Sequence, residues 1–390
     1  MTIRARADPM LRHCPYATDP QPSMSLSPEA LSVCLLSFEG PDRYAQAGGL
    51  GVRVTHLAEA LARREIPTRL LFVGDPEAPA VETREEGRLT LHRWGQWISA
   101  HHPGGVYDGE DAKRADFEES VPPFVIEEVV RPALADGRLP VIMAEEWHTV
   151  ETLCRLHDQL EDAGLRHRCA LLWNANNTMS FHRIDWGRLE AAAQITTVSR
   201  YMKYRMWDEG VNPIVIPNGL PEELLAPVSE GRIDTLRSIL DPDERAVMLF
   251  KAGRFDPAKR WIMAVEAAAQ LKAQGHAVAF PLTGGVEPHG YEVMDRARAL
   301  GLRVTTLTEQ PETWTDLVAQ LRAAPEAEIY NMRFYLPQSM MRVFFAAADA
   351  VLANSGHEPF GLVGLEAMAA GGVVMTGATG EEYVVDGESA

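Results

Sequence analysis

Long apolar runs are absent from the chain, which has none near the roughly 18 residues that a membrane-spanning helix requires. The basic residues Arg4 and Arg6 are not followed by the apolar segment of a secretory signal. We therefore expect a cytoplasmic protein with no transmembrane segment. Residues 1–28 are rich in proline and poor in large apolar groups, and we expect them to form a flexible tail.

Cysteine is scarce, and no two of the cysteines are close enough in sequence to suggest a zinc site or a disulfide framework. The four positions are Cys14, Cys34, Cys154 and Cys169. We expect reduced, buried thiols. A His-x-x-His array is also absent, and the sequence predicts no bound metal and no cofactor.

Positive charge is in deficit. The chain has 37 Lys and Arg against 55 Asp and Glu, a formal net charge of −18. An acidic surface disfavours a nucleic acid or an anionic membrane as the main partner. It does not exclude a small basic pocket for a phosphorylated ligand.

What is present is ordinary globular composition, with 46% apolar and 24% charged residues. At about 150 residues per domain, 390 residues correspond to two or three domains. Short Val/Ile/Leu runs alternate with stretches of helical period, including 51–64 and 259–274, and the pattern restarts near residue 245. The expected strands are 31–38, 69–74, 140–144, 169–174, 194–198, 213–216, 246–252, 277–282, 303–307, 350–353 and 373–375.

Strands that alternate with helices predict parallel sheets covered on both faces. We predict an α/β protein with two Rossmann-like domains that face each other across a cleft. The expected boundaries are 29–217 for the N-terminal domain and 218–390 for the C-terminal domain. Ligands of such sheets bind beyond the carboxyl ends of the strands, so residues that follow strands are the functional candidates.

The most informative string runs from His357 to Glu366 and joins a strand to the next helix. Glu358 falls in the loop, and Glu366 falls in the second turn of the helix. The backbone N–H groups near Gly361 would form a seat for a phosphate at the positive end of that helix. The carboxylate of Glu366 could bind a ribose diol. The alternative is that both glutamates are ordinary surface residues of a solvated helix, which would have the same sequence pattern.

Two further strings also follow strands. Arg254 and Lys259 flank a tight turn and can converge on one anion, or they can be ordinary surface cations. The glycine-rich segment 47–51 precedes the helix 51–64, where glycines let a ligand approach and leave backbone N–H groups free. A plain structural turn explains those glycines equally well.

Two single residues complete the candidates. His148 ends the segment 145–148 at a strand terminus, where it could face the cleft on the acceptor side or be a buried structural histidine. Ser199 is better explained as the N-cap of the following helix than as a ligand-binding group.

Taken in order, these strings resemble one known family. Ala47-Gly48-Gly49-Leu50-Gly51, Ile216-Pro217-Asn218-Gly219, Gly253-Arg254-Phe255-Asp256-Pro257-x-Lys259 and Glu358-Pro359-Phe360-Gly361-Leu362…Glu366 are similar to segments of the retaining nucleotide-sugar glycosyltransferases of the glycogen-synthase and sucrose-synthase type (glycosyltransferase family 4). The resemblance covers the chain from about residue 31 to its end. It implies the two-domain GT-B architecture and sugar transfer with retention of configuration and without a metal.

The resemblance also implies a role for each matching residue. Arg254 and Lys259 would hold the donor diphosphate, Glu358 would contact the donor sugar, and Glu366 would bind the ribose. The backbone of Gly361, Leu362 and Val363 would lie beside the sugar and phosphate, and Gly49 and Gly51 would approach the donor from the other domain.

The chain departs from the family in three places. Asn176 stands where members usually have a histidine beside the donor sugar; an asparagine can replace a histidine that hydrogen-bonds but not one that must be charged. Gln46-Ala47 stands where the glycogen-synthase type has a lysine before its glycine pair. The chain also stops at Ala390, before the last strand and helices of the family, so we expect the C-terminal domain to be truncated.

The leading interpretation is a retaining, metal-independent glycosyltransferase whose partners are a nucleoside-diphosphate sugar and a hydroxyl acceptor. Its catalytic candidates are Glu358, Arg254, Lys259 and Asn176. The alternatives are a nucleotide-sugar epimerase of similar architecture and a non-catalytic nucleotide-sugar-binding protein. Linear spacing leaves the base and sugar of the donor, the acceptor and the oligomeric state open.

Overall fold

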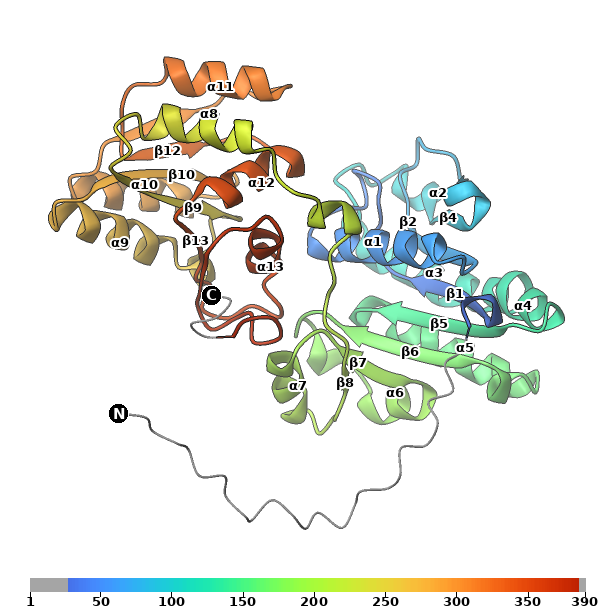
Figure 1. Cartoon of the computed structure of the whole chain (residues 1–390). Coiled ribbons are helices and arrows are strands. Elements are labelled where there is room, and N and C mark those ends of the chain that lie inside the picture. The colour runs from blue at the N-terminus through green and yellow to red at the C-terminus, as the bar shows by residue number, and fades with distance from the viewer. Residues whose placement is uncertain (1–26, 386–390) are drawn as a thin grey trace, which may run out of the picture.

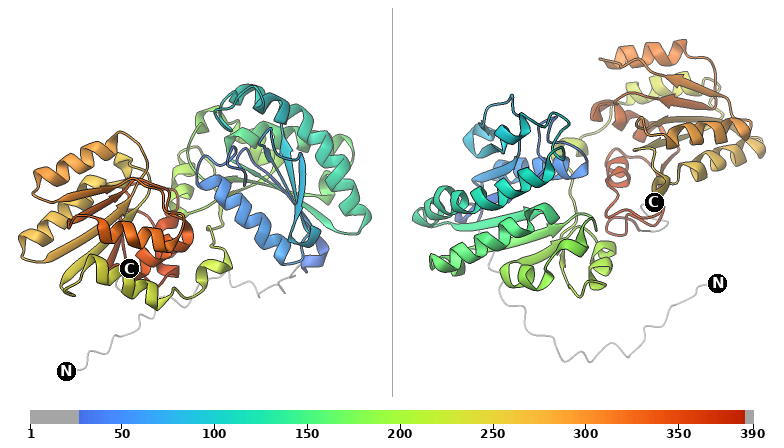
Figure 2. Two further views of the ribbon diagram at one scale, coloured as in Figure 1. Left: turned by 90° about the horizontal axis from the view of Figure 1, so that it is seen from above. Right: turned by 180° about the vertical axis from the view of Figure 1, so that it is seen from behind.

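The computed structural model describes residues 27–385, which form two lobes joined by one linker (Figure 1). Each lobe contains its own sheet, and the lobes remain separate bodies when seen from above and from behind (Figure 2). The predicted tail lies outside the described residues except for its last two positions. The predicted truncation point at Ala390 also lies outside them.

The N-terminal lobe is an eight-stranded sheet in the order β3-β4-β2-β1-β5-β6-β7-β8. Its strands are β1 (Leu31–Leu36), β2 (Thr68–Val73), β3 (Val81–Arg84), β4 (Leu89–Trp94), β5 (Leu139–Glu145), β6 (Ala170–Ala175), β7 (Gln194–Thr197) and β8 (Ile214–Val215). All neighbouring strands are parallel except β3, which runs antiparallel to β4 at one edge. The helices are α1 (Gly49–Arg63), α2 (Gln96–Ser99), α3 (Glu110–Val125), α4 (Arg131–Ala135), α5 (Val150–Asp162), α6 (Trp186–Ala192) and α7 (Arg200–Trp207).

The C-terminal lobe is a six-stranded parallel sheet in the order β11-β12-β10-β9-β13-β14. Its strands are β9 (Ala246–Ala252), β10 (Ala277–Thr283), β11 (Val304–Leu307), β12 (Ile329–Met332), β13 (Ala350–Ala353) and β14 (Val374–Thr376). Its helices are α8 (Glu230–Leu240), α9 (Trp261–Ala273), α10 (His289–Ala299), α11 (Trp314–Ala323), α12 (Gln338–Ala347) and α13 (Leu362–Ala369).

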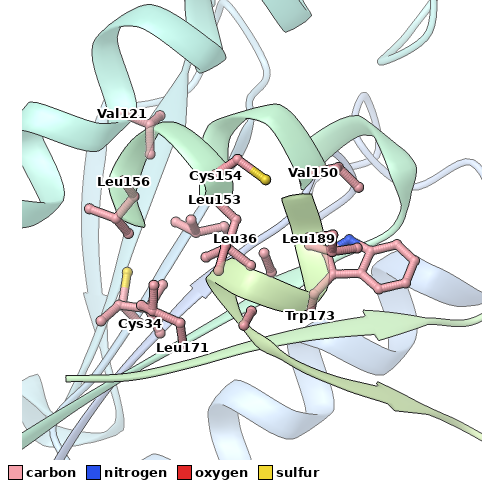
Figure 3. Packing of buried hydrophobic residues seen from close by; sticks show 14 of the residues in the cluster. Cys34, Leu36, Val121, Val150, Leu153, Cys154, Leu156, Leu171, Trp173 and Leu189 are labelled. Atoms are coloured by element: carbon pink, nitrogen blue, oxygen red, sulfur yellow. The ribbon is translucent and has the colours of Figure 1, made fainter. Parts of the chain in front are cut away.

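Both sheets are buried on both faces, as their continuous apolar strands predict. In β1, Cys34 and Leu36 join one core cluster, whereas Val33 and Leu35 join the cluster under α1. Figure 3 shows the first of these clusters, where residues of α5 pack onto Cys34, Leu171 and Trp173 from the strands. The prediction of a two-domain α/β protein is therefore confirmed.

The thiols behave as expected within the described part of the chain. Cys34, Cys154 and Cys169 are buried and form no disulfide, and Cys14 lies outside the described residues. Burial raises the pKa of Cys34 to about 12 and that of Cys154 to about 11, so both thiols stay protonated and unreactive.

Every predicted strand is present, but three strands were missed: β3, β4 and β12. β4 carries Thr90, His92 and Arg93 among its apolar residues, and β3 is a short edge strand with alternating charges. β12 has only four residues, all buried between β10 and β11. Short strands of mixed polarity acquire their structure from their neighbours rather than from their own pattern.

In each sheet the chain order reverses at one point, and ligands of such sheets bind there. The reversal lies between β1 and β5 in the N-terminal lobe and between β9 and β13 in the C-terminal lobe. The loops that follow these four strands contain most of the candidate residues. The fold therefore collects those residues into two places, one on each lobe.

Candidate functional site

A cleft of about 640 Å³ lies between α1, the linker and the first turns of α12 and α13. On the side of the C-terminal lobe, the cleft is lined by Leu362 and Glu366 of α13 and by Gln338 of α12. Burial raises the pKa of the Glu366 carboxyl, and the Gln338 side chain partly offsets that effect. Glu366 thus faces the space between the lobes rather than open solvent.

Arg254 and Lys259 lie in the turn between β9 and α9. Gly253 begins the turn at a φ of 136°, a backbone conformation that favours glycine. The indole N–H of Trp261 donates to the carbonyl of Arg254 at 2.8 Å, and Phe255 packs against that indole. These contacts hold the turn while the Arg254 side chain remains exposed.

The structure brings Lys259 against Glu358, which lies 99 positions later in the chain. Lys259 Nζ donates to Glu358 Oε1, and about a quarter of each side chain is exposed, 24% and 23%. The two residues that the resemblance assigns to phosphate and sugar therefore pair with each other in this structure. They meet because β9 and β13 are neighbours in the sheet.

The loop after β13 leads into α13 through Gly361, which precedes the helix at a φ of 87°. The Tyr383 hydroxyl donates to the carbonyl of Gly361, and its ring packs against Phe360. The Ser199 hydroxyl of the other lobe donates to the carbonyl of Pro359. This segment is thus held from both lobes.

Ser199 also accepts a hydrogen bond from the N–H of Met202 at 3.0 Å, so its predicted role as the N-cap of α7 is confirmed. Two neighbours reinforce the contact between the lobes. Arg200 pairs with Glu382 at 3.1 Å, and Tyr201 stacks on His357 with ring centroids 6.2 Å apart.

The glycine loop before α1 differs from the expectation of free N–H groups. The carboxylate of Glu39, which is 5% exposed, accepts from the N–H of Gly48 and of Gly51 at 3.0 Å each and from Ala47 at 3.3 Å. These donors are therefore already paired, and the expectation was wrong for them. A side chain at Gly51 would approach the carbonyl of Gly40 to 2.9 Å, whereas a side chain at Gly49 would meet open space.

Arg53 is the main site residue that the sequence analysis missed. It lies away from the apolar face of α1, yet its side chain is only 9% exposed and lines the cleft. Its guanidinium donates to both carboxylate oxygens of Glu145, at 3.3 and 3.4 Å, and to Asn218 Oδ1 in the linker. The sequence signal for Arg53 was the pair Glu145 and Glu146 at the end of β5, because a carboxylate that is buried there needs a cation as partner.

Asn176 belongs to the same network. Its amide nitrogen donates to Glu145 Oε2 at 2.7 Å, and its backbone N–H donates to Glu146 Oε1 at 2.7 Å. Glu146 is buried and has a φ of 67° with a ψ of 168°, a region that almost only glycine occupies. Burial raises the pKa of the Glu146 carboxyl to about 8.

His148 is 5% exposed and does not line the cleft. Its ring stacks on Phe38 at 4.5 Å and lies 5.4 Å from the ring of Tyr107. Its Nε2 lies 3.3 Å from Glu110, and burial lowers its pKa to about 3, so the ring is neutral. This placement favours the structural alternative over a direct contact with an acceptor.

Neither a metal cluster nor a membrane span was found in the part of the chain that the structure describes. No three His, Cys, Asp or Glu side chains there are grouped as metal ligands would be. No helix within residues 27–385 is long and apolar enough to cross a bilayer.

Comparison with known proteins agrees with this arrangement. Residues 232–389 match the family model described as "Glycosyl transferases group 1". The chain carries a glycosyltransferase group 1 domain. This match covers less than half of the chain and agrees with the predicted class of enzyme, a glycosyltransferase. The retaining family 4 type stays a prediction.

Two curated relatives are D-inositol 3-phosphate glycosyltransferases. The one from Geodermatophilus obscurus is 29% identical over 167 residues, which are 43% of this chain and only 33% of that protein. The one from Stackebrandtia nassauensis is 25% identical over 380 residues, which cover 88% of this chain and 74% of that protein.

Solved structures show the same fold. The catalytic domain of starch synthase IV from Arabidopsis thaliana, bound to ADP and acarbose, superposes with a TM-score of 0.61 at 15% identity and covers 92% of this chain and 85% of its own. Sucrose-phosphate synthase from Thermosynechococcus elongatus gives 0.58 at 20% identity, covering 90% and 82%. The predicted GT-B architecture is confirmed.

Proposed function

We propose that this glycosyltransferase moves a sugar from a nucleoside-diphosphate sugar to a hydroxyl acceptor, with retention of anomeric configuration and without a bound metal. The observation that carries the proposal is the pairing of Lys259 with Glu358 at the reversal point of the C-terminal sheet, with Arg254 exposed in the same turn as Lys259 and Glu366 in the cleft between the lobes. Two cations and two carboxylates in this arrangement suit a ligand that is anionic at one end and rich in hydroxyls at the other.

In this proposal Arg254 and Lys259 bind the donor diphosphate, Glu358 contacts the sugar and Glu366 binds the ribose. The backbone of Gly361–Val363 lies beside the phosphate. Relatives of the same fold support a nucleotide here, because solved structures include a starch synthase bound to ADP and a protein from Anabaena in complex with UDP.

The proposed reaction does not depend on a strong general base from the protein. The bond between the anomeric carbon and the leaving phosphate oxygen breaks, and a bond to the acceptor oxygen forms on the same face of the sugar. The acceptor proton passes to an oxygen of the leaving diphosphate. Arg254 and Lys259 stabilise the charge that develops on that group, which is the largest contribution a protein makes to such a step.

The N-terminal lobe supplies the acceptor side in this proposal. Asn176 takes the place beside the donor sugar, where its amide is held by Glu145, and it acts by hydrogen bonding rather than by charge. Gly49, which has open space around it, is the point at which the glycine loop approaches the donor. The curated relatives are named for D-inositol 3-phosphate, so a phosphorylated polyol is the first acceptor to test. A cytoplasmic location remains a prediction.

The decisive experiment incubates the purified protein with labelled ADP-, UDP- and GDP-sugars, with and without candidate acceptors and EDTA. Transfer, or slow hydrolysis of one donor, that persists in EDTA and gives a product of retained configuration supports the proposal. A donor returned with an altered sugar indicates an epimerase instead. Binding without any turnover indicates a nucleotide-sugar-binding protein.

A further inference from the structure

Lys251 is a buried lysine that the proposed function leaves without a role. It is the last residue but one of β9 and is only 2% exposed. It lies two residues after Leu249 and therefore points to the same face of the sheet, the face that α9 covers. Lysine is almost never fully buried unless it is paired, so its position at the carboxyl end of β9 requires an explanation.

All direct partners of the Lys251 ammonium are neutral. Its Nζ donates to the carbonyl of Leu352 at 2.9 Å and to Asn354 Oδ1 at 2.6 Å, and it lies 5.0 Å from the centre of the Trp261 ring. Within residues 27–385, no carboxylate lies within ion-pair distance of this nitrogen. The group has hydrogen bonds but no counter-charge.

The charged groups that act on Lys251 are Lys259 on the β9–α9 turn and Glu358 on the loop after β13. These two pair with each other, so Glu358 does not serve as the counter-ion of Lys251. Burial, together with the charge of Lys259, lowers the pKa of Lys251 to about 7, and Glu358 opposes the shift. Arg260, at the end of the same turn, packs against Gly356 in the loop that Lys251 supports.

We propose that Lys251 is a proton-accepting residue beneath the donor site, and that binding of a nucleoside diphosphate at Arg254 and Lys259 draws one proton from solvent onto Lys251 Nζ. The inference rests on the proposed function, because it takes the anion to be the donor diphosphate. Lys251 does not touch that ligand in this account. It acts through the electric field and through the loop that it holds by Leu352 and Asn354.

The direction of the coupling follows from charge. An anion at Lys259 cancels the repulsion that disfavours a second ammonium below it, and it adds negative charge close to a site of low polarity. The ammonium form of Lys251 is therefore more stable in the complex than in the free protein. Well below pH 7 the group is already charged and little proton is taken up, whereas well above pH 7 binding requires a proton.

The test is calorimetric titration of the full chain with ADP, UDP and GDP, in two buffers that differ in ionisation enthalpy. Measurements run at pH 8 and above, because a terminal phosphate with a pKa of about 6 is ionised there and contributes no proton. With a pKa near 7, about nine-tenths of Lys251 is neutral at pH 8, so uptake should approach about 0.9 proton per bound nucleotide. Affinity should also fall by up to about tenfold between pH 8 and pH 9.

Three variants separate proton uptake by Lys251 from proton uptake by other groups. Lys251→Met should bind more weakly and take up no proton. Lys251→Arg keeps a fixed charge and should bind without uptake and without the pH dependence. Lys272→Met, a surface lysine at the far end of α9 that pairs with Glu328, should behave like the wild type. Thermal unfolding of each variant shows that it is folded.

The outcomes are distinct. Binding of a nucleotide by the wild type with no uptake at pH 8 overturns the role of Lys251 and leaves the proposed function standing. Equal uptake in the wild type and in Lys251→Arg assigns the proton to another group and overturns the role as well. If none of the three nucleotides binds at any pH, the proposed function fails, and this inference fails with it.

Discussion

At the scale of single residues, the site is a set of charges that already satisfy one another. Lys259 pairs with Glu358, Arg53 pairs with Glu145, and the Glu39 carboxylate caps the glycine loop. In the proposed function a diphosphate has to compete with the first of these pairs, whereas Arg254 forms no ion pair within the described chain. Arg254 is thus the cation that the proposed donor can reach without breaking an ion pair.

Replacing Arg254 with Ala should reduce transfer with little effect on folding, and Lys259→Ala should do nearly the same. Loss of one charge-assisted contact to the leaving group costs about 2–4 kcal/mol, or roughly 30- to 1000-fold in rate. Both side chains are at least partly exposed, so the unfolding temperature should hardly move. Steady-state rates together with thermal unfolding check this, and near-normal turnover in both variants would remove them from the site.

Glu358→Gln should have two opposite effects. It frees Lys259, so a nucleoside diphosphate without a sugar should bind more tightly, by about two- to fivefold for a partly exposed pair worth about 0.5–1 kcal/mol. Transfer should fall, because the contact with the sugar is lost. Glu190→Gln changes the same charge on the exposed side of α6 and should alter neither quantity. Unchanged ADP, UDP and GDP affinities would show that the ion pair does not compete with phosphate.

Glu366→Gln tests ribose binding separately from chemistry. The carboxyl faces the cleft, and the amide keeps its shape but loses part of its capacity to accept hydrogen bonds. Donor affinity should fall by about 1–2 kcal/mol, while turnover of bound donor changes less. Calorimetric titration beside steady-state kinetics gives both numbers. Donor binding equal to that of the wild type would leave Glu366 with no role in the ribose site.

At the scale of elements, α7 joins the two lobes through its N-cap. Ser199 satisfies the N–H of Met202 and also reaches the carbonyl of Pro359, next to Glu358. One hydroxyl therefore stabilises a helix in one lobe and holds the loop before α13 in the other. The local and the long-range contribution of this hydroxyl can be separated by comparing substitutions at two helix caps.

Ser199→Ala should lower the free energy of unfolding by about 1 kcal/mol, the usual cost of a lost N-cap. It should also reduce transfer, because Pro359 loses its support. Thr313→Ala is the matched control: Thr313 caps α11 with the same geometry, through a capping box with Asp316, and has no contact with the site. Both variants should lose stability, Ser199→Ala the more because it also loses the bond to Pro359, and only Ser199→Ala should lose activity. Equal activities would mean that the contact with Pro359 is incidental.

At the scale of the whole molecule, the linker is fastened to the N-terminal lobe through Arg53. This side chain bridges buried Glu145 and Asn218, and the linker forms one wall of the cleft. Removing one partner of a buried ion pair is costly because the other charge remains behind, whereas removing only the linker contact leaves the pair intact.

Arg53→Met should therefore destabilise the protein by about 3–5 kcal/mol. Asn218→Ala should cost about 1.5–3 kcal/mol at most, as the loss of one hydrogen bond to a charged group, and should mainly loosen the linker. Denaturant unfolding measures the first effect, and the rate of proteolysis within residues 217–225 measures the second. A similar loss of stability in the two variants would contradict a dominant Arg53–Glu145 pair.

Local patterns in the chain were sufficient for the class of fold, for both sheets and for most strands. Burial on both faces leaves long apolar runs, and the residues after each strand lie at its carboxyl end in any parallel sheet. For this reason Arg254, Lys259, Glu358 and Glu366 could be selected before their contacts were known. The same logic failed for β12, because Tyr330 and Asn331 interrupt its apolar run.

Contacts between distant segments were decided only by the tertiary structure. The pairing of Lys259 with Glu358 and the burial of Arg53 against Glu145 depend on which strands are neighbours. An arginine on the polar side of an isolated helix has the same sequence pattern whether it meets water or a carboxylate. Arg53 turns to Glu145 because that carboxylate is buried at the end of β5 and needs a cation. Its burial is a property of the assembled sheet and not of the helix that contains Arg53.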